Sequence, residues 1–164
     1  MTAFLNEVQA MQNPALGAAL VWRFACGFTP DTSPHGTPLP LAFVVLPLVL
    51  HARTLEKVMG TQAASGLRRF EAKFSEDNRG DVLLSLQPRV LAMRELSLRS
   101  LRIAMRSGLV TLVPKEAAIW PRSRSAPPTD ARAVVRLLKS AEKLGEWCRD
   151  ISLFEVAGLL KVEF

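Results

Sequence analysis

The longest apolar run of this sequence covers residues 39–51, where twelve consecutive residues carry no polar side chain and the thirteenth is His51. A helix that crosses the hydrocarbon core of a membrane needs about 20 apolar residues, so this run is typical of a core helix instead. Pro47 lies inside it, and a proline in a helix interior costs about 3 kcal/mol unless packing compensates. We therefore expect a helix at about 41–51 that is buried on all sides and forms the centre of the fold.

Other segments repeat apolar residues with the period of a helix. Asn13 precedes Pro14, the order of a cap residue and a first-turn proline, and this pair predicts a helix through about Ala25. Residues 27–38 are dense in Gly, Pro, Ser, Thr and Asp and predict a loop. Further helices are expected at 2–11, 54–59, 61–74, 82–93, 97–108, 130–150 and 153–160, with a loop at 75–81.

The pattern changes after Gly108. Residues 109–113 form a short β-like run, residues 114–115 predict a turn, and residues 117–120 form a second apolar run. A helix, a glycine and a hairpin in this order indicate a winged helix. The sequence therefore predicts a mainly α fold in one compact helical domain, 1–164, with a helical part at 1–75, a winged-helix-like helix plus β-hairpin at 76–124 and C-terminal helices at 125–164.

The formal net charge of +6 comes from one part of the chain. Basic and acidic side chains balance over residues 1–66, three against three, and over residues 125–164, six against six. Residues 67–124 hold twelve Lys or Arg against six Asp or Glu. A function that depends on positive charge is therefore expected in this middle part.

The helix expected at 97–108 carries a stripe of arginines beside an apolar seam, about 100° apart around the helix. The seam consists of Leu98, Leu101 and Met105, and the stripe consists of Arg99, Arg102 and Arg106. Guanidinium groups match phosphate and carboxylate oxygens, and the helix before a wing is where a winged helix contacts DNA. The stripe is thus a candidate surface for nucleic acid or for an acidic protein partner, and the alternative is a solvated face. Without Asn or Gln among its arginines, it is not expected to read adenine.

Two further arginines, Arg122 and Arg124, alternate with serines in a polar, proline-rich connector at 122–129. They either extend the basic surface along a phosphate backbone or belong to a mobile charged linker. Trp120 ends the second predicted strand, and we expect it to anchor the core or an interface rather than to stack on a base.

The reactive residues form no catalytic pattern. His35 is expected to be solvated, and His51 is expected to reach a backbone carbonyl rather than to act as a ligand or base. Neither belongs to an HExxH, CxxC or GxSxG motif or to a Gly-rich phosphate loop. The carboxylates at 76, 77 and 81 lie near Arg79, which predicts charge compensation. We expect no enzyme, no cofactor and no metal site.

The two cysteines, Cys26 and Cys148, lie in apolar helical segments and are expected to be buried thiols rather than a disulfide. The N-terminal segment has an acidic residue and no basic one before Arg23, which is the wrong charge for a secretory signal or a transit peptide. We therefore expect a cytoplasmic protein.

Three segments taken together resemble a known family. They are NPAL at 13–16, PLPLAFVVLPLVLHARTLEKV at 38–58 and AEKLGEWCRDISLFEVAGLLKV at 141–162. With them, the chain from about residue 13 onward is similar to the middle component of three-component ABC-ATPase conflict systems, the Lamassu-type anti-phage defence systems of bacteria. The end departs from the family pattern, because LLKVEF at 159–164 stands where a Gly-Val-Arg-Pro-like finish is expected.

This resemblance implies a non-catalytic adaptor subunit that joins an SMC-like ABC ATPase to an effector, often a nuclease, and it transfers no catalytic residue. The arginine stripe adds double-stranded DNA as a candidate partner. A hydrophobic content of 49% fits a subunit that buries apolar surface against partners. The alternative from a different class is a stand-alone winged-helix DNA-binding regulator.

Overall fold

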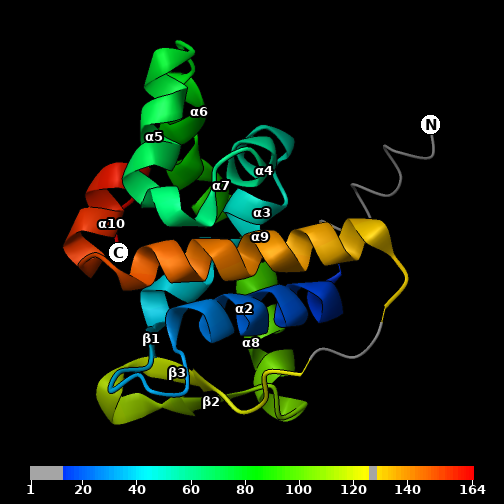
Figure 1. The fold of residues 1–164 in the computed structure, drawn as a ribbon. Coiled ribbons are helices and arrows are strands. Elements are labelled where there is room, and N and C mark those ends of the chain that lie inside the picture. The colour runs from blue at the N-terminus through cyan, green and yellow to red at the C-terminus, as the bar shows by residue number, and fades with distance from the viewer. Residues whose placement is uncertain (1–12, 126–128) are drawn as a thin grey trace.

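The structure is a computed structural model that describes residues 13–125 and 129–164, and these residues are mainly helical with one small sheet (Figure 1). The predicted mainly α fold is confirmed, and the helix predicted at 2–11 lies outside the described residues. The helices are α2 (Pro14–Phe28), α3 (Val45–Val49), α4 (Ala52–Met59), α5 (Gly66–Glu76), α6 (Gly80–Leu84), α7 (Leu86–Ala92), α8 (Arg94–Arg106), α9 (Arg132–Arg149) and α10 (Leu153–Leu160). Short 3-10 helices cover Leu39–Phe43, Ala63–Ser65 and Pro114–Glu116, and the strands are β1 (Thr37–Pro38), β2 (Val110–Val113) and β3 (Ala118–Pro121).

The first described helix, α2, is the helix around which α8 and α9 pack (Figure 1). Its start follows the prediction: the Asn13 carboxamide oxygen accepts from the backbone N–H of Ala15 at 3.0 Å and of Leu16 at 3.2 Å. Pro14 takes the first helical position, where its missing N–H has no intrahelical partner to lose.

Two glycines bring the backbones of α2 and α9 into contact. A Cβ atom on Gly27 would lie 2.1 Å from the carbonyl oxygen of Glu142, and one on Gly145 would lie 2.1 Å from the carbonyl oxygen of Phe24. Any larger residue at either position would therefore push the two helices apart.

The apolar run is buried, as predicted, but it is not one helix. Val44, Val45 and Leu46 are fully buried, and the run divides into the 3-10 helix Leu39–Phe43 and the short helix α3. The prediction of one helix at 41–51 was wrong because α3 starts only at Val45. Pro47 consequently sits in the first turn of α3, where a backbone N–H would have no intrahelical acceptor.

The helix predicted at 82–93 is likewise divided into two shorter helices, the second of which has a proline in its first turn. The chain forms α6 and then α7, with a break at Ser85, and Pro88 falls in the first turn of α7. A second break at Met93 starts α8 at Arg94, three residues before the predicted start at Ser97.

Among the described helices, no single one has the length and apolar character needed to cross a membrane. The helical segments Leu39–Val49 and Ala52–Met59 are together long and apolar enough to span a membrane, but they are bent by 99° relative to each other.

The three strands form an antiparallel sheet in the order β1-β3-β2. The predicted hairpin is β2 and β3, and Leu112 faces Ile119 across it. Strand β1 falls inside the segment that was predicted as a loop. It is only two residues long and ends in Pro38, so it has neither the length nor the alternation from which a strand can be predicted.

Candidate interaction surface

The three arginines of the predicted stripe are exposed on α8: Arg99, Arg102 and Arg106. The opposite side of α8 is buried, as shown by Ser97, Ser100, Leu101 and Ala104. With about 3.6 residues per turn, the arginines point almost directly away from the centre of this buried side. The stripe is therefore the outermost part of the helix.

The apolar seam predicted for α8 is confirmed at Leu101, which is buried, and at Met105, which packs against the core, but it was wrong at Leu98. Leu98 is 39% exposed, and the α8 residue that meets α2 is Ser100: a Cβ atom on Gly17 of α2 would lie 2.0 Å from the Ser100 hydroxyl oxygen. Small residues let two helices approach closely, and a hydrophobic pattern that counts only large side chains misses them. The hydroxyls of Ser97 and Ser100 are buried without a hydrogen-bond partner among the described residues.

A fourth arginine continues the surface beyond the end of α8. Gly108 has φ of 75° and turns the chain into β2, while the N–H of Leu109 donates to the Ala104 carbonyl at 2.9 Å. The exposed Arg122 places its Nη1 atom 4.0 Å from the position of a Cβ on Gly108. We call Arg99, Arg102, Arg106 and Arg122 the α8 basic surface; none of these four forms an ion pair within residues 13–125 and 129–164.

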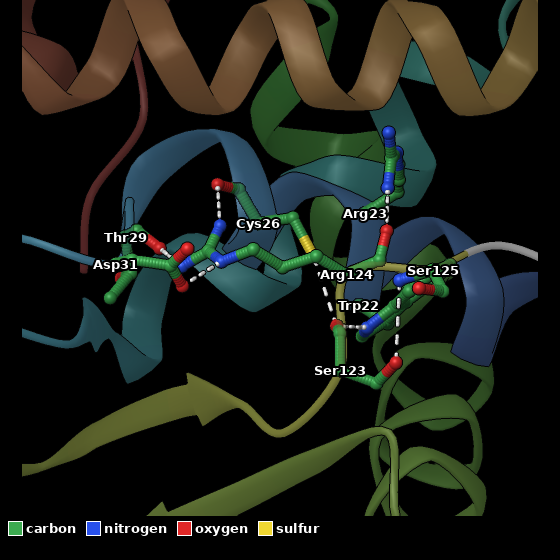
Figure 2. Close-up of polar contacts among 8 residues, drawn as sticks. All are labelled: Trp22, Arg23, Cys26, Thr29, Asp31, Ser123, Arg124 and Ser125. Atoms are coloured by element: carbon green, nitrogen blue, oxygen red, sulfur yellow. Dashed lines mark hydrogen bonds and ion pairs between the residues drawn. The ribbon is translucent and has the colours of Figure 1, made fainter.

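The fifth predicted arginine, Arg124, lies in a different environment. Figure 2 shows its guanidinium turned toward the end of α2, where Nε donates to Asp31 Oδ1 at 2.5 Å and Nη1 donates to the Cys26 carbonyl at 2.9 Å. Nη2 donates to the Thr29 carbonyl. These carbonyls lie at the C-terminal end of α2, so Arg124 caps that helix and does not extend the α8 basic surface.

The first part of the predicted connector is fixed along α2 by hydrogen bonds (Figure 2). The Trp22 indole N–H donates to the Ser123 carbonyl at 2.6 Å, and Arg23 Nη1 donates to the Arg124 carbonyl at 2.9 Å. Arg23 also pairs with Glu142 of α9 at 2.9 Å. Ser123 and Arg124 are thus held against α2, while the Arg122 N–H donates to the Leu109 carbonyl at 2.9 Å, so this part of the connector is not a mobile linker.

The aromatic side chain at the end of the hairpin, Trp120, holds the sheet against the segment before β1. Its indole N–H donates to Glu116 Oε2 at 2.9 Å. A Cβ atom on Gly36 would lie 2.6 Å from the same indole nitrogen, so the ring rests directly on the Gly36 backbone. Trp120 is half-buried and packs on this segment rather than in the core, so the predicted core anchor is not confirmed.

His51 caps the start of α4. Its Nδ1 accepts a hydrogen bond from the Thr54 N–H at 3.5 Å. The predicted hydrogen bond to a backbone carbonyl was therefore wrong, because His51 is the acceptor and its partner is a backbone N–H. Burial, with the nearby charges of Arg89 and Arg53, lowers the pKa of His51. The other histidine, His35, is exposed as predicted.

Both cysteines are buried free thiols, as predicted. Burial raises the pKa of Cys148 to about 12, and burial also raises the pKa of Cys26 despite the nearby charges of Arg23 and Arg124. Burial thus favours the protonated form of both thiols.

Charge compensation in the 75–81 segment uses other partners than Arg79. Glu76 pairs with Arg69 at 2.5 Å, and Asp77 pairs with Lys57 of α4. Over residues 13–125 and 129–164, no three His, Cys, Asp or Glu side chains gather as a metal site would require.

A second basic group was missed by the sequence prediction. Arg132, Arg136 and Lys139 are exposed and share one face of the N-terminal half of α9. The balanced charge of residues 125–164 concealed them, because most of the acidic residues of this part follow Lys139. A charge count over about ten residues would have found them.

Exposed apolar side chains form the other feature that the hydrophobic pattern did not reveal. Phe154 of α10 is 90% exposed, and no atom lies within 4 Å of a Cβ position on Gly158, one turn further along. The remaining large exposed apolar side chains of the described residues are Met59, Leu84, Leu91, Leu98 and Phe164.

One family model matches this sequence, the one described as ABC-three component (ABC-3C) system Middle Component 3. The match covers residues 1–164, which include the apolar run, the winged-helix-like part and the C-terminal helices. No curated protein and no solved structure matches the chain.

Proposed function

Since the chain belongs to the Middle Component 3 family of ABC-three component systems, we propose that it is a non-catalytic adaptor that joins an ABC ATPase to an effector. The family match over the whole chain is the observation that carries this proposal. In its finer form, the ATPase is SMC-like, the effector is a nuclease, and the three proteins form a cytoplasmic, Lamassu-type anti-phage defence complex that also senses DNA.

An exposed aromatic side chain supports a protein-binding role. Aromatic residues dominate the energetics of protein interfaces when they fill a partner's pocket. In the free protein, an exposed Phe side chain is in contact with water, which is unfavourable for an apolar surface. Phe154 is 90% exposed, and the space over Gly158 beside it is open. We therefore assign Phe154 as the first residue to test at the interface with the ATPase or the effector.

The test is co-purification of the three proteins of the system, expressed together with an affinity tag on this chain. We expect the ATPase and the effector to be recovered with it. Phe154→Ala should reduce recovery of one of them, whereas Leu98→Ala, which removes a less exposed apolar side chain on α8, should not. Recovery of the tagged chain alone would refute the adaptor proposal.

The alternative function is a stand-alone winged-helix DNA-binding regulator. The observation in its favour is that α8, with its exposed arginines, leads directly into the β2–β3 hairpin. Such a regulator would bind one DNA sequence much more tightly than others and would need no ATPase. A protein that co-purifies with an ATPase and binds all duplexes equally contradicts this alternative.

A further inference from the structure

We propose that the α8 basic surface binds the phosphate backbone of double-stranded DNA without reading its base sequence. This inference rests on the proposed function, in which the complex senses DNA. It deepens that function by naming the residues that bind and the ligand that they bind. Arg99, Arg102, Arg106 and Arg122 carry it, and Arg124 does not belong to it.

The arginines stand on a firmly positioned helix. The buried side of α8 packs against α2, where Ser100 contacts Gly17 so closely that no Cβ atom would fit between them. The C-terminal end of α8 is closed by the Leu109 N–H bond to the Ala104 carbonyl at 2.9 Å. The positions from which the guanidinium groups extend are therefore set before any ligand arrives, which lowers the cost of binding.

The spacing of the arginines suits a polyanion. Arg99 and Arg106 are separated by seven residues, which is about 10 Å along a helix axis, and Arg122 lies next to Gly108 just beyond that end. Each guanidinium offers a planar fork of N–H donors that matches phosphate oxygens. The surface can thus contact several phosphates of a DNA strand at once.

An acidic residue in the same row limits which part of α8 can approach DNA. Glu95 is exposed, and it precedes Arg99 by four residues on the outward face of the first turn. Recognition helices of helix-turn-helix proteins present their N-terminal residues to base edges, and a carboxylate there would repel the backbone. Contact is therefore made through α8 from Arg99 to its C-terminal end and through Arg122, which fits backbone binding and not base readout.

The composition of the surface favours DNA over an acidic protein. The centre of a protein interface is depleted in charged residues, whereas protein–DNA interfaces are polar and strongly positive. On α8 the exposed apolar side chain is Leu98, at 39%, and the more exposed Leu84, Leu91 and Phe154 lie on α6, α7 and α10. The outward face of α8 is thus built of charge.

The experiment measures binding of the full-length chain to a fluorescein-labelled 30-base-pair duplex by anisotropy, between ~50 and ~200 mM salt. Four phosphate contacts predict a slope of about −3 to −4 for log K against log salt. Replacing Arg99, Arg102 and Arg106 together by alanine should reduce the magnitude of this slope by about 3 and weaken binding at every salt concentration.

The matched control is the triple alanine variant of Arg132, Arg136 and Lys139, which removes the same charge from α9. It should retain nearly all of the wild-type slope. Glu95→Gln should instead tighten binding, a gain that misfolding cannot produce. Two duplexes of unrelated sequence should bind with equal affinity.

Three results would overturn the inference: no binding at ~50 mM salt, where phosphate contacts are screened least; equal losses in both triple variants; or a preference for one duplex sequence. Co-purification of each variant with the ATPase separates the two proposals. A complex that forms normally but does not bind DNA contradicts only this inference. An α8 triple variant that binds DNA like the wild type but loses the ATPase would assign the surface to a protein partner instead.

Discussion

The contact between α2 and α9 provides the sharpest test of the fold through the variant Gly145→Ala. The added Cβ would lie 2.1 Å from the Phe24 carbonyl oxygen and 2.8 Å from the Phe28 nitrogen. Both atoms belong to the backbone of α2, so no side-chain rotation relieves the clash and the helices must separate.

The expected magnitude is the difference of two effects. Overpacking a tight core costs about 1–3 kcal/mol, and a clash with backbone on a rigid helix belongs at the upper end. Alanine is the better helix former by about 1 kcal/mol, which offsets part of that cost. We expect a net loss of about 2 kcal/mol in the free energy of unfolding, or about 4–8 °C in melting temperature for a chain of this size.

Thermal and urea unfolding followed by circular dichroism measure the change, with Gly158→Ala as the matched control. Gly158 also lies in a helix, but no atom is within 4 Å of its Cβ position. The control should therefore be stabilised by about 0.5–1 kcal/mol. If Gly145→Ala is as stable as the control variant, α2 and α9 do not pack at backbone contact and the reasoning is refuted.

Two further predictions concern His51 and Arg124. The pKa of His51 is lowered in the folded chain, so below about pH 6.5 the unfolded chain binds a proton that the folded chain does not. The contribution of neutral His51 to stability is therefore complete above that pH and is lost as the pH falls further. His51→Asn keeps a capping side chain without this titration, so urea melts at pH 7 and pH 5 should differ less than in the wild type, and an unchanged difference would contradict this account. Arg124→Ala leaves the carbonyls of Cys26 and Thr29 without their donor and should destabilise the chain by about 1–3 kcal/mol while changing DNA affinity much less than Arg122→Ala; equal effects of the two variants on DNA would contradict the assigned roles.

Local signals in the sequence predict those elements whose ends depend on one or two residues. Asn13 and Pro14 place the start of α2, and Gly108 separates α8 from the hairpin, as its positive φ requires. The apolar run identifies the buried centre without defining its form. Its division depends on where the first turn of α3 starts. Residues 44–49 are all buried, so the sequence there shows no alternation of apolar and polar residues from which that start could be inferred.

The site is predicted less completely than the fold, because exposure depends on partners that are distant in the sequence. Arg122 and Arg124 are two residues apart in the same serine-rich segment, and the sequence gives no reason to separate them. The chain leaves the sheet after Pro121 and follows α2, whose C-terminal carbonyls then bind Arg124, while Arg122 stays beside Gly108 and faces solvent. Those carbonyls belong to residues 26 and 29, more than ninety residues earlier. The fold thus gives Arg124 carbonyl acceptors, whereas the four arginines of the α8 basic surface have no ion-pair partner among the described residues, and this difference separates them from the fifth.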